Sequence, residues 1–257
     1  MEVIRLNQQL FNSNKFNKNE IEDNKNGKRP YFYSFKRNNH RICVPLRTNA
    51  SSVPERYKLN LNQVQPHKPN SALDTTKSLV IDENTYKANK QKTSLHSSVY
   101  SYIKENKDSL ENKFDVLTKD YVNAKGKMAD IPLTKYSTLQ YFHDELNLQP
   151  IIDDKLLKNC VKELNEKGYT NKYENLKSEI PNLSETIESY EILNEFKKLS
   201  NYPSKLVTDD IKKPVLEIVK DNNKFSLTSN NITENPEKHL KNFLDYDPKD
   251  RENNLDL

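Results

Sequence analysis

Glycine is nearly absent from the 257-residue chain, which contains only Gly27, Gly126 and Gly168. Glycine-rich phosphate loops need several glycines within a few residues, because their backbone must approach the phosphates closely. The three glycines lie too far apart to form such a loop. The sequence therefore excludes P-loop and Rossmann-type nucleotide chemistry.

Cysteine is also scarce, and Cys43 and Cys160 lack the spacing of metal ligands. We expect two buried, reduced thiols. The five histidines form no HxxxH or HExxH motif, and no GxSxG nucleophile motif occurs. These absences argue against a zinc enzyme and a serine hydrolase, so we expect neither a metal nor a cofactor.

Long apolar runs are missing as well. No stretch of 18 apolar residues and no apolar N-terminal leader occurs, and the apolar residues make up only 33% of the chain. These features predict a cytoplasmic protein without a signal peptide or membrane span. Because charged residues make up 30%, we also expect a modest core with polar loops.

The charge is unevenly distributed along the chain. The net charge is +4 overall, +8 over residues 1–149 and −4 over residues 150–257. A basic segment favours a polyanionic partner such as RNA, and an acidic segment does not. The sequence thus predicts two regions with different partners.

A basic, aromatic segment at residues 28–49 predicts a β-hairpin. Tyr31–Arg37 and Arg41–Leu46 are the expected strands, joined by a turn at residues 38–40. The second strand is expected to stop at Pro45, because proline lacks the backbone N–H that a ladder requires.

Elsewhere, hydrophobic periodicity predicts a chain rich in helices. Strands are expected at residues 3–6 and 77–81, a helical turn at 8–12, loops at 13–27 and 50–71, and helices at 93–125, 134–147, 152–164, 183–199, 212–220 and 236–246.

Metal-free RNA cleavage requires the protein to orient the substrate's 2′-OH, remove its proton and stabilise charge on phosphorus. Lys28, Arg47 and Thr48 carry side chains suited to that work. Cations hold phosphates and tyrosine rings stack on unpaired bases. The further candidates for RNA binding are Arg29, Tyr31, Lys36, Arg37, Arg41, Asn49 and His67. His143, beside Phe142, is expected to be a hydrogen-bonded core histidine instead.

Several segments occur in the order and spacing of a known family. They are EVIRLNQQLF, KRPYFYSF, VPLRTN, SALDTTKSLVI and YSTLQYFHDEL. Over about residues 2–148, the chain resembles the TenpN branch of the ToxN/AbiQ type III toxins. The resemblance implies a toxin–antitoxin endoribonuclease used in phage defence. It would cleave RNA without metal, leave 2′,3′-cyclic phosphate ends, and be neutralised by a repeated pseudoknot RNA antitoxin.

The resemblance also implies roles for individual residues. Thr48 falls on the family's active-site serine and Arg47 precedes it, while Lys28 or Arg29 falls on a basic position before the first hairpin strand. Asp74 and Lys77 match the family's leucine–aspartate motif and join the RNA-binding candidates. Threonine keeps the hydroxyl of the serine that it replaces, but its methyl group stiffens χ1.

We therefore expect an α+β fold, with a compact, strongly twisted antiparallel sheet and packed helices in an endoribonuclease domain at residues 1–149. Residues 150–257 are expected to form an acidic, mostly helical extension with a frayed tail. Its apolar stripes predict either docking on the basic face or recruitment of another protein, and a plain helical extension is the alternative. A non-cleaving RNA-binding protein and a helical interaction protein remain alternatives for the whole chain.

Overall fold

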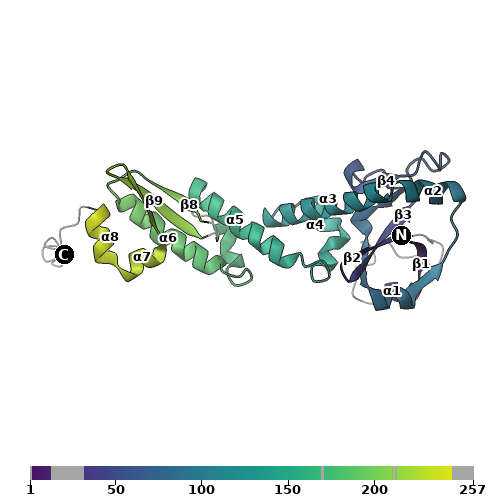
Figure 1. Ribbon diagram of the computed structural model, residues 1–257, viewed down its shortest axis with the longest axis horizontal. Coiled ribbons are helices and arrows are strands. Elements are labelled where there is room, and N and C mark those ends of the chain that lie inside the picture. Colours follow the sequence, from purple (N-terminus) through teal and green to yellow (C-terminus); the bar gives the residue numbers. More distant parts are fainter. Residues whose placement is uncertain (1, 13–31, 169–170, 210, 212, 245–257) are drawn as a thin grey trace. The chain divides into compact units, whose positions relative to one another are not determined.

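The computed structural model describes residues 2–12, 32–168, 171–209, 211 and 213–244 (Figure 1). The chain divides into two compact units, Met1–Ile152 and Asp153–Leu257, close to the predicted boundary at residue 149. The predicted α+β class is confirmed, because helices and an antiparallel sheet both contribute substantially. The described helices include none with the length and hydrophobicity needed to cross a bilayer.

The first unit is built on an antiparallel sheet of seven strands. These are β1 Glu2–Leu6, β2 Phe32–Arg37, β3 His40–Arg47, β4 Lys58–Asn60, β5 Ala72–Asp74, β6 Leu79–Asp82 and β7 Lys90–Lys92. The strand order is β4-β5-β3-β2-β1-β7, and β6 also pairs with β3. The strands predicted at residues 3–6 and 77–81 are present as β1 and β6, and the helical turn predicted at residues 8–12 is confirmed.

The predicted hairpin is present, but its turn is shorter than expected. His40 pairs with Arg37 in the ladder, so only Asn38 and Asn39 form the turn. Asn38 has a φ of 51°, in the left-handed region that asparagine tolerates better than most residues. Two-residue hairpin turns usually use such residues, so glycine is not needed here.

The prediction that the second hairpin strand stops at Pro45 is wrong. β3 continues to Arg47, because its partner strand changes at the proline. On one edge of β3, β6 pairs with His40–Cys43 and β5 pairs with Leu46 and Arg47. Pro45 lies between these partners, so its missing N–H removes no ladder bond on that edge.

A short helix, α1 Glu83–Asn89, follows β6. The single helix predicted over residues 93–125 is instead two helices, α2 Ser97–Glu105 and α3 Lys107–Gly126. Asn106 separates α2 from α3, and its side-chain amide donates to the carbonyl of Tyr102 over 2.9 Å. Asparagine interrupts helices in this way, because its side chain competes for backbone hydrogen bonds. His96 occupies the N-cap position of α2.

The single helix predicted over residues 134–147 is also wrong. The chain forms α4 Pro132–Tyr136, a 3-10 helix at Thr138–Tyr141, and then turns. Ser137 accepts a hydrogen bond from the N–H of Leu139, and the Thr138 hydroxyl donates to the carbonyl of Ser78 over 2.5 Å. These side-chain bonds to backbone groups interrupt the helix and tie the segment to the start of β6.

Helix α3 covers the sheet of the first unit and closes its core (Figure 1). Phe114 of α3 packs edge-to-face on Phe35 of β2, with ring centroids 5.8 Å apart. The Tyr33 hydroxyl donates to Glu111 over 2.6 Å. Cys43 is fully buried in this core, and burial raises the pKa of its thiol to about 12. It is a free, buried thiol, as predicted.

The second unit combines helices with a three-stranded antiparallel sheet. Its helices are α5 Gln149–Lys167, α6 Leu183–Leu199, α7 Ser229–Glu234 and α8 Pro236–Phe243, with a 3-10 helix at Asn171–Leu176. Its strands are β8 Ser204–Thr208, β9 Pro214–Lys220 and β10 Asn223–Leu227. The first residues of α5 belong to the first unit, which ends at Ile152. The helices predicted at 152–164, 183–199 and 236–246 are confirmed, and the helix predicted at 212–220 is wrong. That segment is β9, and Asp221 and Asn222, both with positive φ, turn it into β10.

The apolar stripes of α5 and α6 pack inside the second unit. Leu156 and Cys160 of α5 share a core cluster with Leu183 and Ile187 of α6. The C-terminal part of α6 packs on the three-stranded sheet, where Leu193 lies in a cluster with residues of β9 (Figure 1). The partner surface that these stripes were expected to need is therefore supplied by their own unit.

His143 makes hydrogen bonds as predicted, but its side chain is half-buried and lies outside the core cluster. One ring nitrogen lies 2.9 Å from the buried Tyr121 hydroxyl and the other lies 2.9 Å from the Gln149 side chain. We expect His143→Ala to destabilise the protein by about 1–3 kcal/mol, because the Tyr121 hydroxyl would lose its partner. Differential scanning calorimetry should show a lower melting temperature. The exposed His67→Ala variant is the control and should melt like the unchanged protein. An unaltered melting temperature for His143→Ala would contradict this role.

Candidate functional site

A pocket of about 550 Å³ lies where β3 ends in the first unit. Its walls come from the end of β3, the loop before β4, the 3-10 helix Thr75–Lys77, and α4 with the residue that follows it. The lining residues are Arg47, Ser52, Val53, Pro54, Tyr57, Thr76, Lys77, Pro132, Leu133, Tyr136 and Ser137.

One wall of the pocket is fixed by the carboxylate of Asp74. This side chain is fully buried and accepts a hydrogen bond over 2.7 Å from Nη1 of Arg47, in an ion pair. Its other oxygen accepts from the backbone N–H of Thr76 over 2.9 Å and from the Thr76 hydroxyl over 2.6 Å. A buried carboxylate with three donors is held in place, so it fixes both Arg47 and the start of the 3-10 helix.

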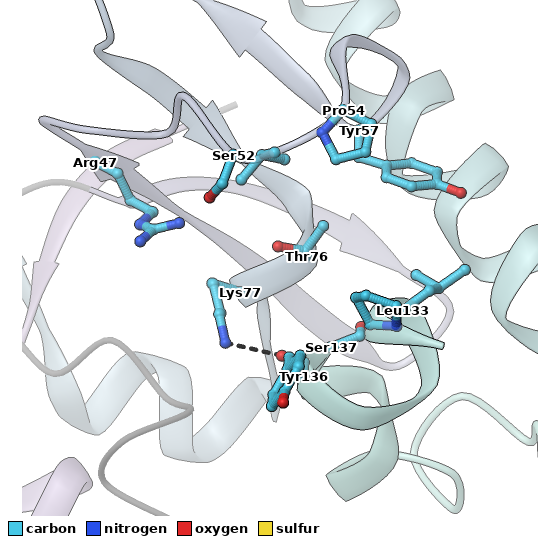
Figure 2. Close-up of a pocket in the computed structure, with 11 residues that line it drawn as sticks. Arg47, Ser52, Pro54, Tyr57, Thr76, Lys77, Leu133, Tyr136 and Ser137 are labelled. Atoms are coloured by element: carbon cyan, nitrogen blue, oxygen red, sulfur yellow. Dashed lines mark hydrogen bonds between the residues drawn. The ribbon is translucent and has the colours of Figure 1, made fainter. Parts of the chain in front are cut away.

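That 3-10 helix delivers Lys77 to the pocket. The Lys77 ammonium donates to the carbonyl of Tyr136 over 2.8 Å, which links the helix to the end of α4 (Figure 2). Figure 2 shows Arg47, Ser52, Thr76 and Lys77 around one side of the pocket. This side combines two cations with two hydroxyl groups.

The other side of the pocket is apolar and aromatic. Pro54, Tyr57 and Leu133 lie there, and the hydroxyl of Tyr57 points away from Arg47 and Lys77 (Figure 2). That hydroxyl donates to Asp120 over 2.9 Å, and burial together with this carboxylate raises the pKa of Tyr57 to about 12. Tyr57 thus contributes a neutral ring to the lining, while Tyr136 is 57% exposed.

The pocket can bind an anion beside a flat apolar group. Arg47 and Lys77 can neutralise a phosphate, and the Ser52 hydroxyl can orient it. The described lining residues include no histidine and no carboxylate, so none of them is an obvious proton acceptor. The described part of the chain also holds no group of three or more metal-ligating side chains. Positioning and charge stabilisation are the chemistry that this lining offers.

The structure brings together three of the predicted site residues. Arg47 and Lys77 line the pocket, and Asp74 lies buried behind Arg47. Thr48 and Asn49 follow directly in an exposed bend and do not line the pocket. The Asn49 side chain instead accepts hydrogen bonds from the backbone N–H and hydroxyl of Ser51, over 3.1 and 2.8 Å.

The remaining predicted residues lie elsewhere. Arg41 lies six residues from Arg47 along β3, a separation of about 20 Å in an extended strand. Arg37 pairs with Asp115 over 2.5 Å, and Arg41 pairs with Glu83 over 2.8 Å. Lys36 is exposed beside the hairpin turn, and His67 is exposed in the loop between β4 and β5. Lys28, Arg29 and Tyr31 lie outside the described residues. The described members of the predicted RNA-binding set therefore extend beyond the Arg47 pocket, along the hairpin and into the loop between β4 and β5.

Sequence reasoning missed four polar contributors to the pocket: Ser52, Thr76, Tyr136 and Ser137. Thr76 lies in SALDTTKSLVI and the last two open YSTLQYFHDEL, both segments that carry the family resemblance. The role of Tyr136 and Ser137 was hidden, because residues 134–147 have the apolar periodicity of a helix. Comparison with protein-family models, curated proteins and solved structures finds no match for this chain. The pocket must therefore be interpreted from its own geometry.

The contrast between two arginine–aspartate pairs gives a stability test. Asp74 is fully buried, whereas Asp115 and its partner Arg37 are largely exposed. We expect Asp74→Ala to lower the free energy of unfolding by about 3–5 kcal/mol, because it strands a partly buried guanidinium. The matched change Asp115→Ala should cost less than about 1 kcal/mol, because water screens that pair. Urea denaturation followed by circular dichroism measures both. Equal effects of the two substitutions would refute the anchoring role of Asp74.

Proposed function

We propose that this protein is a metal-independent endoribonuclease, a toxin of a type III toxin–antitoxin system with an RNA antitoxin and a role in phage defence. The observation that carries the proposal is the meeting of Arg47 and Lys77 in one pocket, with Arg47 held by buried Asp74. The resemblance of VPLRTN and SALDTTKSLVI to the ToxN/AbiQ family supports it, since these segments supply all three residues.

In this proposal the scissile phosphate binds between Arg47 and Lys77. The guanidinium presents parallel N–H donors to the phosphate oxygens, and the ammonium adds a second positive charge. Both stabilise the charge that develops on phosphorus when the 2′-OH attacks. Thr48 follows Arg47 directly, and its exposed hydroxyl is available to contact the ribose or phosphate from outside the pocket.

A base next to the scissile phosphate would stack on the apolar side. Tyr136 is the most exposed aromatic residue at the pocket, and its own carbonyl binds Lys77. A base on the Tyr136 ring would therefore lie beside a phosphate at Lys77. Stacking of an unpaired base on an aromatic ring is the usual basis for recognising single-stranded RNA.

One alternative has a specific observation in its favour. The described lining lacks a histidine or carboxylate to accept the 2′-OH proton, which suits RNA binding without cleavage. Incubation with a mixed RNA pool separates the two readings. A cleaving enzyme shortens the RNA, whereas a binding protein retards it intact in a gel and releases it as salt rises.

We expect the full chain to cleave RNA in the presence of EDTA and to leave 2′,3′-cyclic phosphate ends, because the substrate's own 2′-OH is the nucleophile. Sequencing of the cleavage ends, with and without phosphatase and kinase treatment, identifies the termini. Activity that disappears in EDTA and returns with Mg²⁺, or that leaves 3′-hydroxyl ends, would overturn this mechanism.

Replacing one lysine in each basic group distinguishes the pocket from the hairpin turn. We expect Lys77→Gln to lower the cleavage rate roughly tenfold to a thousandfold, the range for losing one transition-state donor. Lys36→Gln removes the same charge at the exposed turn and should change the rate less than about threefold. Thr48→Ala should also lower the rate without lowering the melting temperature. Wild-type cleavage by both Lys77→Gln and Thr48→Ala would sink the site assignment.

Tyr136 offers a test of base stacking. Tyr136→Ala should raise the KM for RNA roughly five- to hundredfold, which corresponds to about 1–3 kcal/mol for one stacked base. Tyr136→Phe keeps the ring and should bind RNA normally. Tyr100→Ala, on the exposed face of α2, is the control for removing a surface tyrosine. Equal KM values for Tyr136→Ala and the unchanged protein would rule out stacking there.

A further inference from the structure

A second basic pocket, separate from the one at Arg47, lies at the edge of the same sheet. It has a volume of about 390 Å³ and is lined by Arg5 of β1 with Lys92, Thr93 and Ser94 at the end of β7. β1 and β7 pair in antiparallel register, with Arg5 opposite Gln91 and Ile4 opposite Lys92. The pairing of these two strands is what places the two cations together.

Arg5 differs from the other described arginines of the first unit. Four of them pair with a carboxylate: Arg37 with Asp115, Arg41 with Glu83, Arg47 with Asp74 and Arg56 with Asp120. Arg5 has no such partner among the described residues, and neither does Lys92 on the opposite strand. This pocket therefore has two positive charges that the described structure leaves uncompensated.

The Nε atom of Arg5 also lacks a hydrogen-bond partner in the described structure, and it is shielded from solvent. A buried N–H without an acceptor is unfavourable, and folded proteins rarely leave one unmatched. An oxyanion in the pocket would accept from the terminal N–H groups of the Arg5 guanidinium. Thr93 and Ser94 add hydroxyl donors to the same pocket.

We propose that Arg5, Lys92, Thr93 and Ser94 form a phosphate-binding site. A phosphate group matches the lining, since it takes up several donors and neutralises two cations at once. The phosphate could belong to an RNA backbone or be a free anion. The site does not depend on cleavage at the Arg47 pocket, so each proposal can fail without the other.

The sheet register relates this site to the Arg47 pocket. Pro45, Phe32 and Ile4 lie opposite one another across β3, β2 and β1. Arg5 is therefore level with Leu46, one residue before Arg47. Because successive residues of a strand point to opposite faces, the Arg5 and Arg47 side chains project from opposite faces of the sheet. The two pockets are therefore separate sites.

The Nε–H signals of arginine side chains in a ¹⁵N-correlated NMR spectrum of the full chain report on this site directly. Arg5→Lys identifies the Arg5 signal by its loss. Inorganic phosphate should shift that signal at concentrations where chloride of equal ionic strength does not. A short oligouridylate with 2′-O-methyl groups, which cannot be cleaved, should shift it at lower concentrations if the ligand is an RNA backbone. A response to inorganic phosphate alone would assign the site to a free anion.

Two substitutions on β7 make the test specific. Lys92→Gln should weaken phosphate binding at the Arg5 signal by roughly tenfold, because it removes one of two cations. Lys90→Gln removes the same charge two residues away, outside the pocket, where the ammonium pairs with Glu2 over 3.1 Å. It should change binding less than about twofold. An Arg5 signal that ignores phosphate and oligouridylate, or that responds equally to chloride, would overturn the proposal, as would equal effects of the two lysine substitutions.

Discussion

The buried carboxylate of Asp74 is the interaction on which the first unit's pocket depends. It ends β5, caps the 3-10 helix that follows, and pairs with Arg47 at the end of β3. An ionised side chain without water must be matched by donors in a fixed arrangement, because any loss leaves an expensive unpaired charge. The geometry of both Arg47 and Lys77 follows from this one group. The rest of the pocket is then closed by the bond from Lys77 to the end of α4.

Much of the fold follows from patterns within single segments. The hairpin, the amphipathic helices α3, α5 and α6, and the buried state of Cys43 and Cys160 agree with the sequence. Errors arose where one side chain decides the local structure. Asn106 separates α2 from α3, and the hydroxyl of Thr138 reaches Ser78 in place of continuing a helix. The Asn106 bond is local and the Thr138 bond joins residues 60 positions apart, and the periodicity of apolar residues reveals neither.

The site was harder to predict than the fold for a similar reason. Arg47 and Lys77 were found because motifs marked them, but Tyr136 and Ser137 reach the pocket only through tertiary packing. The basic residues of the hairpin lie at both of its ends. A β-strand separates its two ends by many ångströms, so Arg41 and Arg47 are near in sequence and far apart in space. Arg5 was overlooked, because its unpaired Nε is visible only once β1 and β7 are paired.

The pocket draws its walls from segments spread between Arg47 and Ser137. Closing such long loops is slow compared with forming local helices, because chain entropy must be lost before the contacts are made. During synthesis, a chain that has emerged only as far as β6 contains Arg47, Asp74 and Lys77 but lacks α4. The pocket is therefore incomplete until most of the first unit has been made. Arg47 is synthesised early, but the nascent chain has no complete pocket until Ser137 has also been made.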